Sequence, residues 1–311
     1  MNPGKGTAGP RVSIVIPTYN QAHFLREALG CVRTQTMPNW EAIVVNNYSN
    51  DATAEVIQEF KDPRICCINF ANRGVIAASR NEGVRRARSK VIAFLDSDDL
   101  WLSNKLEVCL DALSSGADLV CHNEMVLKGR DRIRELRYGP VSKATERGLL
   151  FGGSCLSPSA VVMKKEFFEA AGGFGEAPEI ATAEDYDLWI RLARTGIRIR
   201  FIDEALGDYR VHKASASRAV LRHMNAVLEV VATNFALLSN PKFIDRILYR
   251  RRRAFIFYTG ARAFIETRNH AEALRYLTKA MLEFPLFLRL VLGFLLLAHS
   301  ALGKARERQA R

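Results

Sequence analysis

Short apolar runs alternate with amphipathic segments through roughly the first 120 residues of the chain. Strands rich in Val and Ile are expected at Val12–Ile16, Glu41–Val45, Ile65–Ile68, Val91–Leu95 and Asp118–Cys121. Helical periodicity is expected between them, at Ala22–Thr34, from Asp51 or Thr53 to Phe60, at Val75–Ala87 and at Asn104–Ser114. This β-α-β-α rhythm predicts an α/β fold, with a Rossmann-like, mostly parallel sheet that has helices on both faces.

Polar loops follow three of the expected strands. They read P-T-Y-N at residues 17–20, N-N-Y-S-N-D at 46–51 and D-S-D-D at 96–99. Ligands of open α/β sheets bind beyond the carboxyl ends of the strands. We therefore expect the three loops to form one site.

The third loop carries carboxylates directly after a buried strand. Alternate residues of an extended segment point the same way, so Asp96 and Asp98 can face one spot. A hard divalent ion such as Mg²⁺ or Mn²⁺, itself holding a diphosphate, would offset their repulsion. A solvated acidic turn is the alternative, and D-x-D alone favours it. The position at the ligand edge of the sheet favours the metal.

The pattern changes after about Arg218, where strand signals stop. Helices are expected at Val220–Leu238 and Lys242–Phe264. The spacing of small and aromatic residues from Phe257 to Pro285 resembles one tetratricopeptide-type hairpin, which as a single copy must pack on another body. Three parts are therefore expected: a flexible lead-in at 1–10, an α/β domain at 11–218 and an all-α region at 219–311.

An apolar stretch lies near the end of the helical region. Phe284–Ala298 is interrupted by Arg289 and is short for a spanning helix. It suits an interfacial helix or a core helix, and the pattern leaves both open. Residues 219–311 hold 16 Lys/Arg and 6 Asp/Glu, within a net charge of +12 for the chain. An anionic membrane surface suits this charge better than nucleic acid, because no groove-reading motif accompanies it.

The composition is that of an ordinary globular protein, with 48% apolar and 25% charged residues. The first eleven residues lack the apolar core of a signal peptide. The six cysteines contain no C-x-x-C pair, which predicts reduced core thiols. We expect a cytoplasmic protein, peripheral at the inner face of the membrane if the apolar stretch binds lipid.

Six motifs occur in the order typical of one enzyme family. They are S-I-V-I-P-T-Y-N (13–20), W-E-A-I-V-V-N-N-Y-S-N-D-A-T (40–53), S-R-N-E-G (79–83), F-L-D-S-D-D-L-W (94–101), A-E-D-Y-D-L-W-I-R (183–191) and Y-R-V-H (209–212). Over residues 11–215 the chain resembles family 2 glycosyltransferases of the GT-A fold, of the inverting, bacterial surface-polysaccharide type. The resemblance implies a nucleoside-diphosphate sugar as donor, with a UDP-sugar favoured.

The resemblance also implies which residues bind the donor. Tyr19 would stack on the base. Asn46 and Asn47 stand where the family usually has an Asp, and an amide oxygen can still accept a pyrimidine N–H. Arg73 would contact phosphate or sugar, or be a solvated loop charge. The donor-binding set is Pro17, Thr18, Tyr19, Asn46, Asn47, Arg73, Arg80, Asp96 and Ser97.

Metal and catalytic roles follow from the same resemblance. The metal ligands would be Asp96, Asp98 and His212, whereas Asp99 is either a further acidic residue of the site or the cap of the helix near Trp101. Asp185 would be the general base, with Glu184 as the second choice, at the start of a helix over Asp187–Thr195. Acidic residues also stabilise a helix N-terminus. Trp189 is either the floor of the acceptor site or part of the core.

The expected activity is metal-dependent, inverting transfer of a sugar to a hydroxyl of a saccharide or lipid-linked saccharide. A sugar-phosphate nucleotidyltransferase is the main alternative enzyme, but it needs a Gly-rich phosphate loop after the first strand, and 13–20 has none. A catalytically weak adaptor acting through its helical tail is the other alternative. Asn46 supports it slightly, whereas the intact Asp96, Asp98, Asp185 and His212 argue against it.

Overall fold

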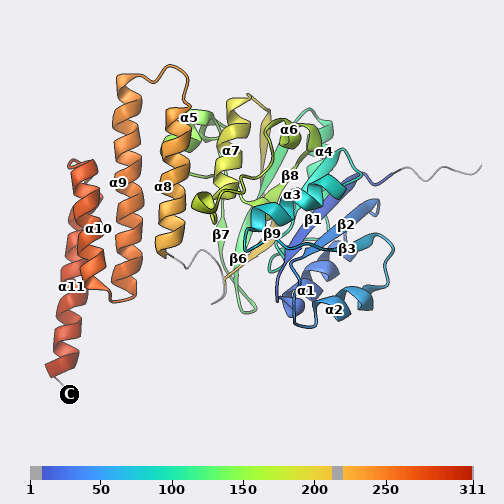
Figure 1. The fold of residues 1–311 in the computed structure, drawn as a ribbon, viewed down its shortest axis with the longest axis horizontal. Helices are drawn as coiled ribbons and strands as arrows, with labels where there is room; N and C mark the ends of the chain where they lie inside the picture. Colours follow the sequence, from blue (N-terminus) through green and yellow to red (C-terminus); the bar gives the residue numbers. More distant parts are fainter. Residues whose placement is uncertain (1–8, 212–219, 310–311) are drawn as a thin grey trace, which may run out of the picture.

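The computed structural model describes residues 9–211 and 220–309, with side chains up to residue 301 (Figure 1). The strands are β1 Val12–Thr18, β2 Trp40–Asn46, β3 Ile65–Asn69, β4 Val91–Phe94, β5 Leu100–Trp101, β6 Leu119–Lys128, β7 Asp131–Leu136, β8 Val161–Lys164 and β9 Ile199–Arg210. The helices are α1 Ala22–Arg33, α2 Thr53–Phe60, α3 Ile76–Arg86, α4 Lys105–Ser114, α5 Glu146–Gly152, α6 Lys165–Ala170, α7 Glu184–Arg194, α8 Val220–Ala236, α9 Phe243–Glu266, α10 His270–Glu283 and α11 Arg289–Gln309. Three 3₁₀ turns, η1 Val141–Lys143, η2 Pro158–Ala160 and η3 Pro178–Ile180, complete the part described.

One sheet runs through the α/β part of the chain in the order β3-β2-β1-β4-β8-β6-β9-β5, with β7 paired to β6. The strands β3, β2, β1 and β4 are parallel, as the rhythm of the sequence predicts. Beyond β4 the sheet is mixed, because β8 is antiparallel to both β4 and β6, while β9 is parallel to β6. The predicted α/β fold is confirmed, and its parallel part is the N-terminal half.

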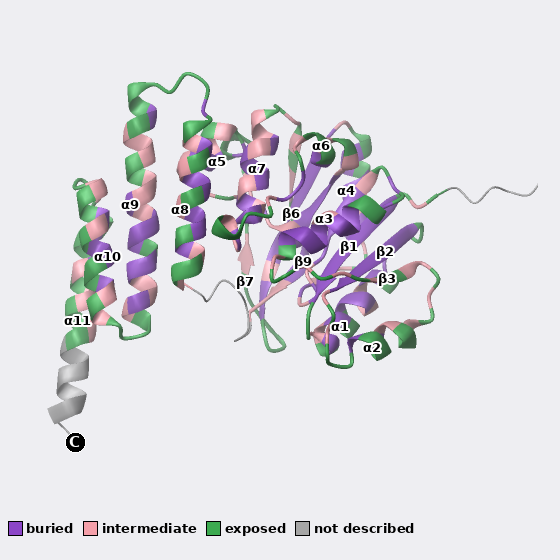
Figure 2. Cartoon of the chain, viewed as in Figure 1, coloured by how far each residue is buried: buried purple, intermediate pink, exposed green. Residues whose placement is uncertain are grey.

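Helices cover both faces of the sheet, as predicted, and each face has its own apolar core. One core lies under α1 and α4 and includes Leu25, Leu29 and Leu106. The other lies under α3 and α7, and it continues without a break into the C-terminal helices (Figure 2). Met224 of α8 and Leu277 of α10 belong to this second core.

The C-terminal region is all-helical, as expected. Helix α8 packs against α7, α9 against α5 and α8, and α10 and α11 against α9. Helices α9 and α10 form the expected hairpin, in which the rings of Phe264 and Tyr276 stack at 5.5 Å. The expected boundary near residue 218 lies outside the described residues and stays a prediction.

The apolar stretch at 284–298 has two different faces. Phe284–Leu288 is a turn with Pro285 in it, and α11 begins only at Arg289. Leu290 is buried against the neighbouring helices, whereas Leu288, Val291, Leu292 and Leu295 are exposed. Val291, Leu292 and Leu295 are spaced to lie on one face of α11, and Leu288 immediately precedes the helix. Within the described chain, no helix is long and apolar enough to span a membrane.

The cysteines are all free, but they are not all in the core. Cys109 and Cys121 are buried, whereas Cys66 and Cys67 are exposed on β3. β3 is an edge strand, so its side chains are less covered than those of the central strands.

Candidate active site

A cleft of about 800 Å³ opens at the carboxyl ends of β1, β2 and β4. Its walls come from the loops after these strands, from the N-terminus of α7, and from α8 and α9. The three polar loops predicted to form one site therefore do meet. Loops and helix N-termini at this edge present free N–H groups and polar side chains to a ligand.

Side chains hold the first two loops together. The Asn20 N–H donates to Ser49 Oγ at 2.9 Å, and the Asn50 N–H donates to Asn20 Oδ1 at 2.9 Å. Asn20 has φ 52°, a left-handed conformation that asparagine tolerates better than most residues. Asp51 accepts from the Ala22 N–H at 2.9 Å, so it fixes the start of α1 as well as its own loop.

Most of the predicted donor residues line the cleft. They are Pro17, Thr18, Tyr19, Asn47, Arg80, Asp96 and Ser97. Tyr19 is 55% exposed, so its ring is free to take a planar partner. The buried Thr18 Oγ1 has no protein partner among the described residues.

Two predicted donor residues do not line the cleft. Asn46 is buried, and its side chain donates to Asn69 Oδ1 at 2.9 Å and accepts from the Ser49 N–H at 3.0 Å. Consecutive residues at a strand end point in opposite directions, so Asn47 faces the cleft while Asn46 joins β2 to β3. Arg73 is an exposed turn residue with φ 52°, which matches the alternative of a solvated charge.

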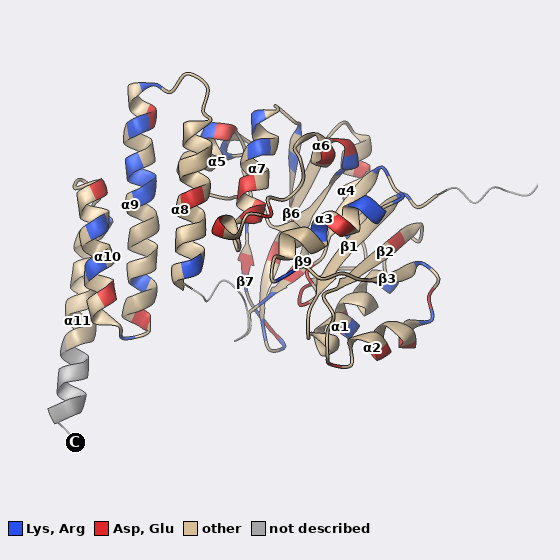
Figure 3. Cartoon of the chain, in the orientation of Figure 1, with Lys and Arg blue, Asp and Glu red and all other residues tan. Residues whose placement is uncertain are grey.

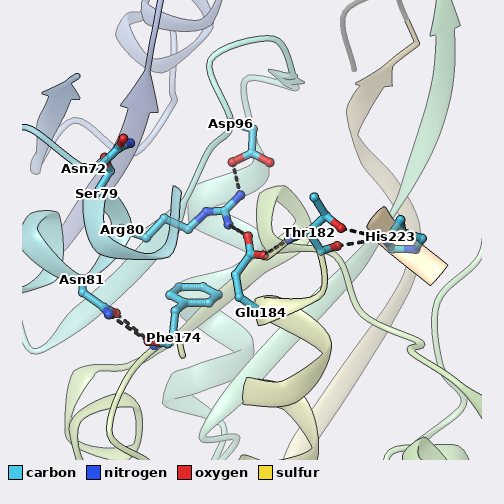
Figure 4. A network of polar contacts seen from close by, with 9 residues as sticks. All are labelled: Asn72, Ser79, Arg80, Asn81, Asp96, Phe174, Thr182, Glu184 and His223. Atoms are coloured by element: carbon cyan, nitrogen blue, oxygen red, sulfur yellow. Dashed lines mark hydrogen bonds and ion pairs between the residues drawn. The ribbon is translucent and has the colours of Figure 1, made fainter. Parts of the chain in front are cut away.

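Arg80 is the central ion-pair residue of the site (Figure 4). It is 4% exposed, and its terminal nitrogens donate to Asp96 Oδ1 at 2.7 Å and to Glu184 Oε1 at 2.9 Å. Burial alone would lower the pKa of Arg80, but the two carboxylates raise it above its ordinary value. Arg80 thus joins α3, the acidic turn and α7, and each of its two terminal nitrogens is paired with a protein carboxylate.

Neighbours of Arg80 in the S-R-N-E-G motif have structural contacts of their own. Ser79 accepts from Asn72 Nδ2 at 2.9 Å, and Asn81 exchanges two hydrogen bonds of 2.9 Å with the backbone of Phe174 (Figure 4). A Cβ on Gly83 would lie 2.3 Å from Val15 Cγ1, so only glycine allows α3 to approach β1 this closely. The motif therefore places the guanidinium by packing its helix tightly.

The acidic loop is a turn at Ser97–Asp98 and not an extended segment. Asp99 is buried and accepts from Ser159 Oγ at 2.6 Å and from the Arg210 N–H at 2.9 Å. Burial, with Glu124 and Asp98 adding to it, raises the pKa of Asp99 well above its usual range. Asp99 therefore anchors the turn to β9 and does not cap a helix.

Arg210 completes this anchor. Its Nε donates to the Asp98 carbonyl at 2.9 Å, and its terminal nitrogen donates to Glu27 Oε2 at 2.5 Å. The motif Y-R-V-H marks the position in the sequence, but nothing local indicates that its arginine holds the acidic turn.

The residues that could hold a divalent ion are Asp96 and Asp98, which both line the cleft. His212, the third predicted ligand, lies outside the described residues. Among the residues described, no group of three or more His, Cys, Asp or Glu side chains forms a closed metal cage. Mg²⁺ is commonly held by one or two carboxylates together with substrate phosphates, so this donor set fits such an ion.

The candidate base lies at the N-terminus of α7, which begins at Glu184, three residues earlier than expected. Glu184 is engaged by Arg80 and by the Thr182 N–H at 2.8 Å, whereas Asp185 lines the cleft. Burial and the neighbouring Glu184 raise the pKa of Asp185 to about 7, against the effect of Arg80. Thr182, just before them, has φ 84°, a strained conformation for a β-branched residue.

Trp189 does not form the floor of the cleft. It is 1% exposed and packs on Phe174 with ring centroids 6.3 Å apart, in the core under α7. This is the second of the two alternatives that the sequence left open. Trp189 lies one helical turn after Asp185. At that turn the helix packs on the core and no longer borders the cleft.

Several cleft residues carry no signal in the sequence. Tyr138 and Ser157 come from loops beyond β7 and before η2. His223 and Val227 come from α8, and Arg252 from α9. His223 Nδ1 lies 3.0 Å from the Thr182 carbonyl, and burial lowers the pKa of its ring. The C-terminal helices thus supply one wall of the cleft.

Comparison with known proteins places these observations in a family. The sequence model described as "Glycosyl transferase family 2" matches residues 13–172. The Escherichia coli UDP-Glc:alpha-D-GlcNAc-diphosphoundecaprenol beta-1,3-glucosyltransferase WfgD is 40% identical over 245 residues, which cover 76% of this chain and 90% of WfgD.

Solved structures share the fold. S. aureus TarS 1–349 in complex with UDP-GlcNAc aligns with a TM-score of 0.64 at 16% identity, over 88% of this chain and 89% of TarS 1–349. The mannosyltransferase PcManGT from Pyrobaculum calidifontis, in complex with GDP-Man and Mn²⁺, aligns with a TM-score of 0.63 at 20% identity, over 95% and 87% of the two chains. With the family model covering more than half of the chain, the protein belongs to glycosyltransferase family 2 and is a glycosyltransferase of the GT-A fold.

Proposed function

We propose that this glycosyltransferase moves a sugar from a nucleoside-diphosphate sugar, with UDP favoured, to a hydroxyl of a saccharide or lipid-linked saccharide, with inversion. The observation that carries the proposal is a half-buried carboxylate, Asp185, in the same cleft as the carboxylates Asp96 and Asp98. WfgD, by its name, uses UDP-glucose and a lipid-linked acceptor, and this supports both halves of the proposal. Family membership favours glycosyl transfer over nucleotidyl transfer.

Different residues along the cleft bind the nucleoside and the metal-bound diphosphate of the donor. Pro17, Thr18 and Tyr19 receive the nucleoside, and Asn47 contributes an amide beside them. Asp96 and Asp98 would hold Mn²⁺ or Mg²⁺, which when bound offsets the charge of the leaving diphosphate.

Asp185 acts as the general base. It takes the proton of the acceptor hydroxyl while the oxygen attacks the anomeric carbon from the face opposite the diphosphate. The bond to the diphosphate breaks in the same displacement, so configuration inverts. A pKa of about 7 matches a base that works near neutral pH. Glu184, tied to Arg80 and Thr182, orients this end of α7.

The direct test is donor turnover over a panel of UDP-, GDP- and dTDP-sugars, with Mn²⁺ and with EDTA. Asp185→Asn should leave UDP affinity within a few-fold and cut turnover by ~10²–10⁴. Glu184→Gln is the matched control, since it removes a neighbouring carboxylate on the same helix. Loss of activity in Glu184→Gln with activity kept in Asp185→Asn would show the base to be Glu184. Nucleotide binding without turnover on any donor would favour the adaptor.

We further propose a peripheral position at the inner face of the membrane, where a lipid-linked acceptor would be met. The support is the exposed apolar face of α11, at Val291, Leu292 and Leu295, together with exposed Leu288 just before the helix, on a C-terminal region rich in Lys and Arg (Figure 3). Apolar contact and attraction of basic residues to anionic lipid add together in such helices.

Point substitutions on the exposed apolar residues test the proposed position at the membrane. Leu288→Ser with Leu292→Ser should reduce sedimentation with anionic liposomes and spare donor hydrolysis. Leu237→Ser with Phe243→Ser is the matched control, because both residues are exposed but lie at the two ends of the connection between α8 and α9, Leu237 just after α8 and Phe243 at the start of α9. Equal liposome binding by the α11 variant and the wild type would refute the membrane role of that face.

A further inference from the structure

Arg252 differs in its partners from the other arginines that line the cleft. Arg80 is paired with Asp96 and Glu184, and Arg210 with Glu27. Arg252 hydrogen-bonds to the Tyr186 side chain, but within the residues described it forms no ion pair with a carboxylate, and its buried Nε has no hydrogen-bond partner there. A half-buried guanidinium in a cleft without a carboxylate is a site for an anion.

The surroundings of Arg252 fix its guanidinium in place. It lies 5.7 Å from the ring centroid of Tyr186 and 5.8 Å from that of Phe255. A Cβ added to Gly153, which follows α5 and has φ +98°, would lie 3.0 Å from both terminal nitrogens. The absence of a side chain at Gly153 thus makes room for the guanidinium, and the two rings flank it.

The position of Arg252 in the cleft identifies the half it serves. Arg252 packs against Tyr186, the residue that follows the proposed base Asp185, and Arg252 and Asp185 line the same cleft. The donor residues Pro17, Thr18 and Tyr19 come from β1 and its loop, and Figure 1 shows β1 and α9 on opposite sides of α7. The guanidinium is therefore on the acceptor side.

We propose that Arg252 binds a phosphate group of the acceptor, so that this enzyme selects acceptors whose sugar is carried on a phosphate or diphosphate. The proposal rests on the proposed function, because it needs Asp185 to mark the acceptor side. A planar fork of N–H donors matches a phosphate with two parallel hydrogen bonds. The helical C-terminal region then contributes directly to acceptor recognition, through α9.

The test is calorimetric titration of the full-length protein with farnesyl diphosphate, a lipid diphosphate without a sugar. UDP and Mn²⁺ are present at saturation so that the donor half is filled. Arg252→Gln should weaken binding of this probe by about 10- to 100-fold, the scale for a lost charge-assisted hydrogen bond. Arg252→Lys, which keeps the charge and loses the fork, should lie between. Arg251→Gln, one position away on an exposed part of α9, should bind the probe like the wild type.

Affinity for UDP alone distinguishes binding of the donor diphosphate from binding of the acceptor phosphate. It should be the same in Arg252→Gln and in the wild type. If Arg252→Gln weakened UDP binding as much as it weakens binding of farnesyl diphosphate, Arg252 would be assigned to the donor diphosphate and the proposal would be overturned. Probe binding that is absent in the wild type, or unchanged in Arg252→Gln, would also overturn it. Failure of the wild type to bind UDP at all would instead refute the proposed function. Unfolding midpoints of the variants show whether they are folded. If Arg252→Gln is not folded, Arg252→Lys takes its place as the test variant.

Discussion

Replacing Arg80 by methionine should strongly destabilise the protein. Methionine retains the aliphatic stem of the arginine, so the change removes the charge while leaving little empty volume. The Arg80 and Glu184 side chains are 5% and 6% exposed, whereas that of Asp96 is 27% exposed. Asp96 can regain water when its partner is lost, but within the part of the chain that the structure describes Glu184 keeps only the Thr182 N–H. Glu184 therefore accounts for most of the expected loss.

The magnitude follows from that asymmetry. Removing one partner of a buried ion pair costs about 3–5 kcal/mol, because the other charge stays buried and uncompensated. We expect Arg80→Met to lose this much unfolding free energy in urea at pH 7.5. Because Arg80 also holds down the pKa of Asp185, any residual activity should shift to higher pH.

The double-mutant cycle identifies the cause. Arg80→Met combined with Glu184→Gln should be less destabilised than the sum of the single changes, by about 1–3 kcal/mol, because the uncompensated charge is gone. Urea unfolding with both fluorescence and circular dichroism gives the four free energies. A loss of unfolding free energy below about 1 kcal/mol in Arg80→Met would refute the view that the Arg80–Glu184 pair stabilises the protein through its charges. Strict additivity of the two single changes in the cycle would refute it as well.

Other changes test separate parts of the site. Asp98→Ala should abolish Mn²⁺-dependent UDP binding while the protein remains folded, and Mn²⁺-enhanced binding equal to wild type by calorimetry would contradict the metal role. Because burial raises the pKa of Asp185 from 3.8 to about 7, its cost to folding is absent below pH 3.8 and is fully present above pH 7. Asp185→Asn should therefore raise the unfolding temperature at pH 8 and change it less at pH 5, and an equal shift at both would count against the buried charge. Gly83→Ala should cost about 1–3 kcal/mol in urea unfolding because its Cβ meets Val15, whereas Gly30→Ala, with open space around it, should not destabilise.

The sequence predicts the parallel half of the sheet because each of its central strands is a buried apolar run. It does not predict the mixed half. β9 mixes apolar residues with Arg200, Asp203 and Glu204 without regular alternation, and β6 continues past Cys121 through buried His122, Asn123 and Glu124. Polar side chains inside a strand are stabilised there by tertiary contacts, such as that of Asn123 with Asp203 at 3.0 Å. Such contacts leave no local pattern.

In the candidate site, too, some features are predictable from the sequence and others depend on tertiary packing. Motif residues at the strand ends, such as Asp96 and Asn47, are found in the cleft, because the topology alone brings strand ends together. The orientation of individual side chains is not fixed by a motif, and Asn46 and Trp189 therefore face the protein interior. Arg252 is more than 60 residues beyond the motif that contains Asp185 and reaches the cleft only through helix packing.

The helical region connects the two proposals about the acceptor. The exposed apolar face belongs to α11, which packs on α9, and α9 carries Arg252 into the cleft. Helix α9 has 24 residues and is therefore about 36 Å long, a rigid element that fixes the position of the cleft relative to that face. A lipid-linked acceptor has its phosphate at the membrane surface and its sugar beyond it. With α11 on the membrane, the phosphate would have to meet Arg252 before the sugar hydroxyl meets Asp185. The length and packing of α9 then limit how far from the membrane the reacting hydroxyl can lie.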